Sequence, residues 1–342
     1  MSKTLLIHAG THKTASTYIQ SRMQDNKVNL ENNGVKLLDI KRKIGSEKIL
    51  PAIVYSRDIE KLRSFLSQDS PQHQALLYSA EQCTQLLLHK KRLKWFMDAL
   101  ESMDFRLRIA IFVRDQPDYI NSMYVQKVKK FLHSIDMTSY IWHCLHRQRY
   151  WFNYNYMFSG MIKNPDLDVE FLPYGRQFGD PFERLMALPG WLQGFQVEWL
   201  PSVVRDLNDQ PGIKGVHLAL NVSRQLESLG VDLSTLRNRA RYIRKYLSPL
   251  GWGSDRYFGL KNDQIELIRD FYQLSNKRFS KKVWPGFSWR SVFSDQKNQH
   301  YNVLDEESLS IAEREEIKLL ARKVIDDLKE ANPDSFPSNI SF

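Results

Sequence analysis

Short apolar runs alternate with helical patterns along the first half of this chain. Four runs have the composition of strands, and they fall at residues 4–8, 35–38, 75–78 and 107–113; a later run at 169–172 could add a fifth strand. Amphipathic stretches separate them, at about 16–30, 57–67, 90–101, 117–131 and 137–163. Strands that alternate with helices predict βαβ units, because parallel neighbours need a crossover connection between them. The sequence therefore predicts an α/β fold of three layers around a mainly parallel sheet.

The second half of the chain has mostly helical patterns. They fall at about 222–246, 263–281 and 308–331, whereas 186–216 is rich in proline, glycine and tryptophan and predicts irregular loop. We expect one domain over residues 1–293, with a helix-rich C-terminal half. Residues 294–342 are expected to form a helical extension with a frayed tail beginning at Asn332.

Composition limits the classes to which the protein can belong. Of 342 residues, 42% are hydrophobic, which is ample for a packed core, and no apolar run reaches the ~18 residues of a membrane span. Two cysteines, Cys83 and Cys144, cannot form a disulfide framework, and the apolar run after Met1 is too short for a secretory signal. We therefore expect a cytoplasmic protein without a membrane span.

The formal net charge of +10 favours anionic partners. The basic residues form short clusters within expected helices, where a solvated helix face explains them. The sequence contains no RRM-like, zinc-finger or helix-turn-helix signature, so no nucleic acid is expected among the partners. By itself this charge favours nucleotides, sulfated or uronic sugars, nucleic acid or a membrane surface.

The most informative stretch follows the first expected strand. It reads Gly10-Thr11-His12-Lys13-Thr14-Ala15-Ser16-Thr17 and opens an amphipathic helix. A strand, a compact polar turn and a helix N-terminus together bind anions, because backbone N–H groups and the helix dipole point into the turn. The spacing is P-loop-like, with Ala15 in the second glycine position, but Lys13 lies inside the loop instead of directly before the Ser/Thr pair.

This loop resembles the 5′-phosphosulfate loop of sulfotransferases that use 3′-phosphoadenosine 5′-phosphosulfate (PAPS), whose pattern is close to G-T-H-K-T-G-[ST]-[ST]. The resemblance implies that all eight residues, 10–17, bind the nucleotide and that Lys13 acts in the transfer step. The departure from the pattern is Ala15, where glycine is usual. Alanine fits this position if its φ is negative and is strained if its φ is positive.

A second motif supports the same family. Residues 106–113 form an apolar strand that ends at Arg114, and Ser122 follows eight residues later on the next helix. In the family, an arginine and a serine at this spacing hold the 3′-phosphate, and a guanidinium binds phosphate through paired N–H bonds. Residues 116–129 are most similar to the bacterial branch that acts on carbohydrates. The resemblance covers roughly residues 3–293, and it is strong only at the two nucleotide motifs.

Sulfuryl transfer to a hydroxyl needs a proton acceptor. The third expected strand is followed by Glu81, at the strand end where open α/β sheets gather their ligands. Related carbohydrate sulfotransferases use a glutamate there, although Glu81 can also be explained as a cap of the next helix. His12 in the loop is a rival base. His8 is another, but its place in the strand predicts that it is packed.

Two other functions remain open from the sequence. A Mg²⁺-dependent P-loop kinase needs an aspartate at the end of the fourth strand, where this chain has Arg114, with Asp115 expected to point elsewhere. A polyanion-binding protein without activity, built on a nucleotide-binding fold, is the second. For sulfotransfer no metal is required, and the histidines around Cys144 do not complete a zinc site.

The acceptor is expected to be a carbohydrate or glycoconjugate with a hydroxyl or amine, shaped by the helices over about 137–293. One segment is unusually aromatic, with Arg147 and Arg149 between the rings, and packing in the core is the first explanation for it. A contribution to the acceptor cleft is the second, because rings stack on sugar faces. The aromatic residues are Tyr140, Trp142, Tyr150, Trp151, Phe152, Tyr154, Tyr156 and Phe158.

Overall fold

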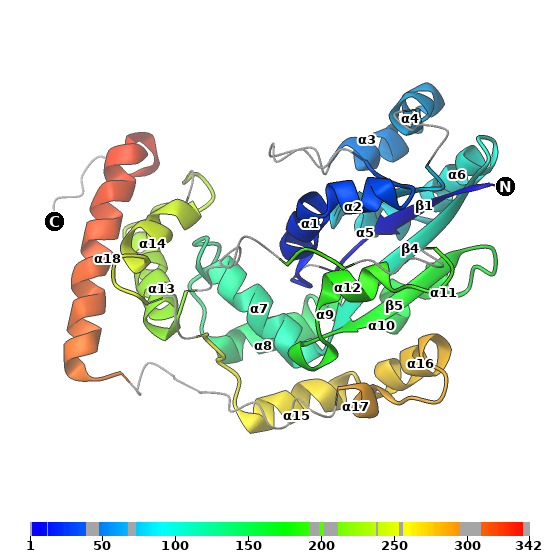
Figure 1. Cartoon of the computed structure of the whole chain (residues 1–342). Helices are drawn as coiled ribbons and strands as arrows, with labels where there is room; N and C mark the ends of the chain where they lie inside the picture. Colours follow the sequence, from blue (N-terminus) through cyan, green and yellow to red (C-terminus); the bar gives the residue numbers. More distant parts are fainter. Residues whose placement is uncertain are drawn as a thin grey trace. The chain divides into compact units, whose positions relative to one another are not determined.

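A computed structural model describes residues 2–11, 13–38, 48–67, 73–191, 198–201, 211–236, 239–252, 256–293 and 309–337, without the side chains of 239–242 (Figure 1). The chain divides into two compact units. The sheet unit consists of Met1–Asp115, Tyr150–Leu207 and Tyr272–Lys297. The helical unit consists of Gln116–Arg149, Asn208–Phe271 and Asn298–Phe342.

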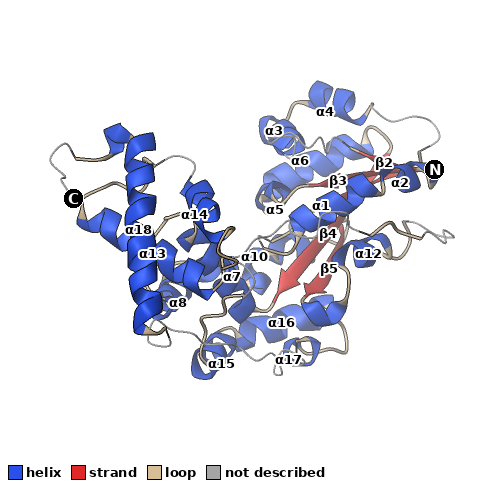
Figure 2. Cartoon of the chain, turned by 60° about the vertical axis from the view of Figure 1, so that its left-hand side comes forward, coloured by secondary structure: helices blue, strands red, loops and turns tan. Residues whose placement is uncertain are grey.

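The sheet unit contains a five-stranded sheet in which every pairing is parallel (Figure 2). Its strands are β1 (Lys3–His8), β2 (Val35–Leu37), β3 (Ala75–Ser79), β4 (Phe105–Arg114) and β5 (Asp168–Tyr174). They lie in the order β2-β3-β1-β4-β5. All five match the apolar runs of the sequence, and the predicted α/β class with a parallel sheet is confirmed.

Helices cover both faces of this sheet. On one face Leu6, Leu77 and Phe112 pack against residues of α1 and α12. On the other face the ring of Tyr78 packs edge-on against Phe65 of α4, with centroids 5.8 Å apart. Both faces of the central strands β1, β3 and β4 are buried, which explains why these three contain continuous apolar runs. Figures 1 and 2 show α1 and α12 side by side over the first face.

The sheet unit also contains most of the shorter helices. They are α1 (Ser16–Asp25), α2 (Lys27–Asn32), α3 (Ile49–Ser56), α4 (Ile59–Leu66), α5 (Gln82–Leu87), α6 (Lys90–Glu101), α9 (Arg149–Phe152, with its first residue in the helical unit), α10 (Tyr154–Met157), α11 (Ser159–Ile162), α12 (Pro181–Met186), α16 (Gln273–Val283) and α17 (Trp289–Val292). The sheet unit also has a 3-10 turn at Arg176–Phe178, and the helical unit has one at Pro333–Ser335.

The strand order places β1 at the point where the chain changes direction across the sheet. From β1 the chain adds β2 and β3 on one side, and it then crosses to the other side for β4 and β5. In open α/β sheets, ligands bind outside the carboxyl ends of the strands at such a switch point. The loop that follows β1 lies at this place, between the carboxyl ends of β3 and β4.

Aromatic side chains from the end of the sheet unit pack on β5 and on the end of β4. The indole of Trp284 donates to the Phe171 carbonyl at 2.8 Å. The indole of Trp289 donates to Oδ1 of Asp115 at the same distance, and this carboxylate is fully buried. Asp115 therefore turns toward α17, as expected from its position one residue beyond the strand end.

The helical unit contains α7 (Gln116–Val128), α8 (Met137–His146), α13 (Ile213–Ser228), α14 (Arg239–Leu247), α15 (Asn262–Phe271) and α18 (Ile311–Ala331). The last of these, expected at 308–331, starts with a capping box between Ser310 and Glu313. Lys214 of α13 pairs with Glu313 at 3.0 Å and ties the two helices together. None of the described helices has the length and apolar character needed to cross a bilayer.

Helix boundaries differ from expectation more than strand boundaries do. The single helix expected at 222–246 is wrong, because Gly230 adopts a left-handed φ of 74° and ends α13 there. The helix expected at 137–163 is also wrong as one element. It breaks after His146 into the short helices α9, α10 and α11, and α10 begins where the side chain of Asn153 accepts the backbone N–H of Tyr156. Helices α3, α12 and α17 were not predicted, and α5 was expected only as the helix that Glu81 would cap.

Candidate functional site

Three threonine hydroxyls hold the loop between β1 and α1 in shape. Thr84 of α5 donates to the Gly10 carbonyl at 2.7 Å, and Thr11 donates to the Phe112 carbonyl of β4 at 3.0 Å. Thr14 donates to the Thr11 carbonyl within the loop at 2.6 Å. The loop is thus fastened to the elements on both sides of it. Because their hydroxyls already have partners, Thr11 and Thr14 serve the loop's conformation.

Two residues of this loop have left-handed backbone conformations without being glycine. Lys13 has φ of 70° and Ala15 has φ of 60° with ψ of 24°. An L-residue with a Cβ pays roughly 1–2 kcal/mol in this region, whereas glycine does not. The sequence left the sign of φ at Ala15 open, and the structure shows the positive, strained value. It lies directly before α1, where the chain changes from the turn to the helix.

Replacing Ala15 by glycine is expected to stabilise the protein by about 0.5–1 kcal/mol. Glycine relieves the left-handed strain of the folded protein, which raises the free energy of unfolding. The greater conformational freedom of glycine in the unfolded chain offsets part of this gain. The free energy of unfolding in urea measures it. The matched control is Ala52→Gly at an exposed position inside α3, which should cost about as much as the first change gains. Equal destabilisation by both changes would contradict strain at Ala15.

The first turn of α1 meets the end of β3 through a side-chain contact. Ser16 is buried and donates its hydroxyl to Oε1 of Glu81. Glu81 takes the N-cap position of α5, but its side chain accepts no capping hydrogen bond there, so the contact with Ser16 replaces the cap. The structure thus brings together an expected nucleotide ligand and the expected base. Thr17 is exposed on α1, and His12 lies outside the described residues.

Arg114, the last residue of β4, faces the same loop. Its Nη1 donates to the Lys13 carbonyl at 3.2 Å, and its guanidinium lies over the Tyr174 ring of β5, 5.6 Å from the centroid. The backbone of Arg114 is held as well, because the Tyr154 hydroxyl donates to its carbonyl at 2.9 Å. The two sequence motifs, far apart along the chain, therefore lie beside each other at the carboxyl ends of adjacent strands.

Ser122, the other residue expected at the 3′-phosphate, belongs to the helical unit, whereas Arg114 belongs to the sheet unit. Within its own unit Ser122 lies on α7 and is 4% exposed. Its neighbour Asn121 donates to the Tyr257 carbonyl at 3.1 Å and accepts from the Gly259 N–H at 3.0 Å. These bonds fix the turn of α7 that carries Ser122.

Sequence reasoning undervalued one residue of this region. His8 ends β1 and is 1% exposed, as expected for a packed side chain, but its Nδ1 also lies 2.8 Å from the hydroxyl of Ser79, the last residue of β3. Burial lowers the pKa of His8 to about 4, against a smaller opposing effect of the Glu81 charge, so its ring is neutral at pH 7. His8 and Ser79 are paired in the register of β1 and β3, which the sequence does not reveal.

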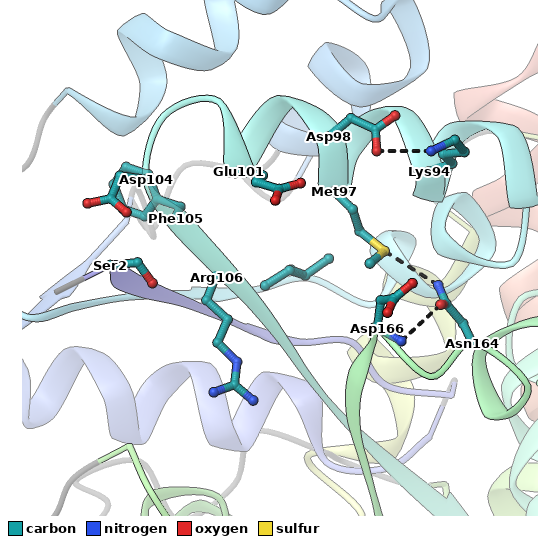
Figure 3. Close-up of a pocket in the computed structure, with 11 residues that line it drawn as sticks. Ser2, Lys94, Met97, Asp98, Glu101, Asp104, Phe105, Arg106, Asn164 and Asp166 are labelled. Atoms are coloured by element: carbon teal, nitrogen blue, oxygen red, sulfur yellow. Dashed lines mark hydrogen bonds and ion pairs between the residues drawn. The ribbon is translucent and has the colours of Figure 1, made fainter.

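A cavity of about 810 Å³ lies at the amino ends of the strands, on the side of the sheet unit away from the loop after β1 (Figure 3). It is lined by the beginnings of β1, β4 and β5 and by α6, where Lys94 pairs with Asp98 at 3.2 Å. Several carboxylates line it, yet within the described ranges no three His, Cys, Asp or Glu side chains gather as they would around a metal ion. The amino ends of parallel strands are not where such folds bind their ligands, so the cavity is separate from the candidate site.

The aromatic segment divides into buried and exposed rings. The buried rings are Tyr140, Phe152, Tyr154 and Phe158, and the exposed rings are Trp142, Tyr150, Trp151 and Tyr156. Tyr150 and Tyr156 belong to the sheet unit, with ring centroids 5.1 Å apart. Core packing thus explains the four buried rings, whereas the other four are exposed to solvent.

The candidate site therefore consists of the loop after β1, the Ser16–Glu81 contact on one side and Arg114 on the other. Its parts come from three neighbouring strands and lie at the switch point of the sheet. These contacts form a compact polar site from residues that are distant in the sequence. No protein-family model matches this chain, and comparison with curated proteins gives no significant match.

Proposed function

We propose that the protein is a sulfotransferase that moves the sulfuryl group of PAPS to a hydroxyl or amine of an acceptor. One observation carries the proposal: the Arg114 guanidinium donates to the carbonyl of Lys13, so the two motifs of the resemblance form one site. The loop offers N–H groups at a helix N-terminus, and the arginine adds a cation that stays charged. Both suit a nucleotide with phosphate groups at its 3′ and 5′ positions.

The proposed reaction is an in-line displacement at sulfur. The acceptor oxygen or nitrogen forms a bond to sulfur while the bond from sulfur to the bridging oxygen of the 5′-phosphosulfate breaks. The acceptor's proton passes to the carboxylate of Glu81. The leaving group keeps the bonding electron pair and departs as 3′-phosphoadenosine 5′-phosphate (PAP). A sulfuryl group carries less charge than a phosphoryl group, and the proposed step uses no metal.

The residues divide this work by position. The backbone of the loop and Ser16 bind the 5′-phosphate, and Arg114 binds the 3′-phosphate. The Lys13 ammonium neutralises charge on the bridging oxygen as the bond breaks. Ser16 donates to Glu81 in the structure, so a phosphate that takes the Ser16 hydroxyl removes this one hydrogen bond from the carboxylate that is to accept the proton.

The first test is nucleotide binding without Mg²⁺, measured by calorimetry with PAP and ATP. The proposal requires PAP to bind much more tightly than ATP. A preference for Mg²⁺–ATP would favour the kinase, and no affinity for either nucleotide would favour a polyanion-binding protein without activity. Transfer of labelled sulfate from PAPS to acceptors then tests the reaction itself.

Replacing Arg114 by alanine is expected to weaken PAP binding by about 2–3 kcal/mol, or roughly 30- to 150-fold in Kd, because a charge-assisted phosphate contact is lost. The matched control is Arg92→Ala, since Arg92 also lies over a ring, that of Tyr55, but on α6 and away from the loop. The control should bind PAP normally. Parental affinity in Arg114→Ala would show that the second motif is not a phosphate site.

We further propose a carbohydrate acceptor and a cytoplasmic location. The exposed rings of Tyr150, Trp151 and Tyr156 and the net charge of +10 suit a sugar that carries acidic groups. Both cysteines are buried free thiols, which fits a reducing compartment. A panel of acidic oligosaccharides, neutral oligosaccharides and phenols decides the acceptor class, and labelling of phenols alone would overturn the carbohydrate proposal.

A further inference from the structure

The buried imidazole of His8 has a polar atom that the candidate site does not yet explain. Its Nδ1 is paired with the Ser79 hydroxyl at 2.8 Å, and its ring lies edge-on to Phe112 with centroids 5.6 Å apart. Its Nε2 is inaccessible to solvent and has no hydrogen-bond partner among the described residues. A buried ring nitrogen without a partner costs free energy, so the position of Nε2 beside the candidate site calls for a physical explanation.

Nε2 of His8 and the side chain of Glu81 are both neighbours of Gly10. A Cβ placed on Gly10 would lie 3.0 Å from Oγ1 of Thr14, 3.8 Å from Nε2 of His8 and 4.0 Å from Cγ of Glu81. The histidine nitrogen and the glutamate side chain therefore border the same small space beside Gly10. Because glycine has no Cβ, no side chain of residue 10 stands between them.

The protonation state of His8 limits what the ring can do. Full burial lowers the pKa of His8 to about 4, so at pH 7 the ring is neutral and carries a single N–H. If the Ser79 hydroxyl donates to Nδ1, that hydrogen must lie on Nε2. The ring then presents a donor to the space that it shares with the Glu81 side chain.

We propose that His8 is a positioning residue for Glu81: the Ser79 hydroxyl donates to Nδ1, and Nε2–H donates to the Glu81 carboxylate once a bound phosphate takes the Ser16 hydroxyl. This inference rests on the proposed function for the role of Glu81. In the free protein, Ser16 holds the carboxylate. In the complex, the chain from Ser79 through His8 holds it instead, aimed at the acceptor.

The tautomer of His8 tests the proposal without any turnover. Long-range ¹H–¹⁵N NMR of the wild-type protein at pH 7 should show the Nε2–H form, with the His8 signals assigned by their loss in His8→Asn or His8→Gln. Addition of PAP should move the Nε2 proton downfield, as a new hydrogen bond to a carboxylate does. An Nδ1–H tautomer, or an Nε2 proton that PAP leaves unchanged, would overturn the proposal.

Kinetics of His8→Asn give a second test, because asparagine can keep the bond to Ser79 but lacks a donor at Nε2. A hydrogen bond to a carboxylate favours its charged form, so losing it should raise the pKa of Glu81. The acid limb of kcat should move up by about one pH unit and kcat at pH 7 should fall roughly tenfold, with PAP affinity unchanged. His8→Gln, which returns a donor near Nε2, should restore part of both.

The matched control is His217→Asn, which removes another buried imidazole, on α13 of the helical unit, and should leave the pH profile unchanged. A His8→Asn profile identical to the parental one would overturn the role of His8. If the wild-type protein binds PAP but transfers sulfate to no acceptor, the proposed function fails. The NMR result still decides the His8–Glu81 contact in that case.

Discussion

Alanine at position 13 is expected to lower turnover by roughly 10²- to 10³-fold and to leave PAP affinity nearly unchanged. Negative charge grows on the bridging oxygen only as the sulfur–oxygen bond breaks, so the Lys13 ammonium stabilises the transition state more than the bound nucleotide. Alanine also keeps a Cβ at a left-handed φ of 70°, so the loop carries the same backbone strain in both proteins. Steady-state rates at saturating PAPS, with a proven acceptor, measure the effect.

The matched control for Lys13 is Lys94→Ala on α6. Lys94 pairs with Asp98 at 3.2 Å in the cavity at the amino ends of the strands, where no part of the proposed reaction takes place. Its removal should leave both turnover and PAP affinity unchanged. Near-parental turnover in Lys13→Ala would show that the loop lysine does not act on the leaving group and would defeat the mechanism.

Glutamine at position 81 is also expected to lower turnover by roughly 10²- to 10³-fold. An amide oxygen can still accept the hydroxyl hydrogen of Ser16, so the contact between α1 and the end of β3 survives. The amide cannot take a proton from the acceptor, and only the transfer step should suffer. PAP affinity and the free energy of unfolding should remain close to parental.

The control for Glu81 is Glu101→Gln, which changes a carboxylate in the cavity at the amino ends of the strands. It should leave activity unchanged. Parental turnover in Glu81→Gln would show that Glu81 is not the proton acceptor. His12 would then be the first residue to replace. A loss of PAP binding in Glu81→Gln would instead show that Glu81 holds the conformation of the loop.

The sheet could be predicted because its strands are buried on both faces. An apolar run such as the one ending at Arg114 needs no knowledge of its neighbours to be recognised. Helix ends depend on single residues with local geometry, and the left-handed Gly230 divided a pattern that looked continuous. The order of the strands could not be read either, because β1 pairs with β3 and β4 across long intervals of sequence.

The loop of the candidate site was predictable for a different reason. Its residues are consecutive, so their spacing alone indicates a turn between a strand and a helix. The contact between Ser16 and Glu81, and that between His8 and Ser79, depend on which strands become neighbours. The conformation of Ala15 depends on how tightly the loop is held, and its residue type alone argued against a positive φ.

The division of the sheet unit into three chain segments affects how the protein can be made and cut. Its last segment, Tyr272–Lys297, provides Trp284 and Trp289, which bond to β5 and to the end of β4. During synthesis the sheet strands leave the ribosome long before these indoles, so the hydrogen bond from Trp289 to Asp115 forms only after residue 289 has been made. A truncation before residue 272 therefore removes part of the sheet unit as well as the C-terminal helix, and no single cut separates the two units.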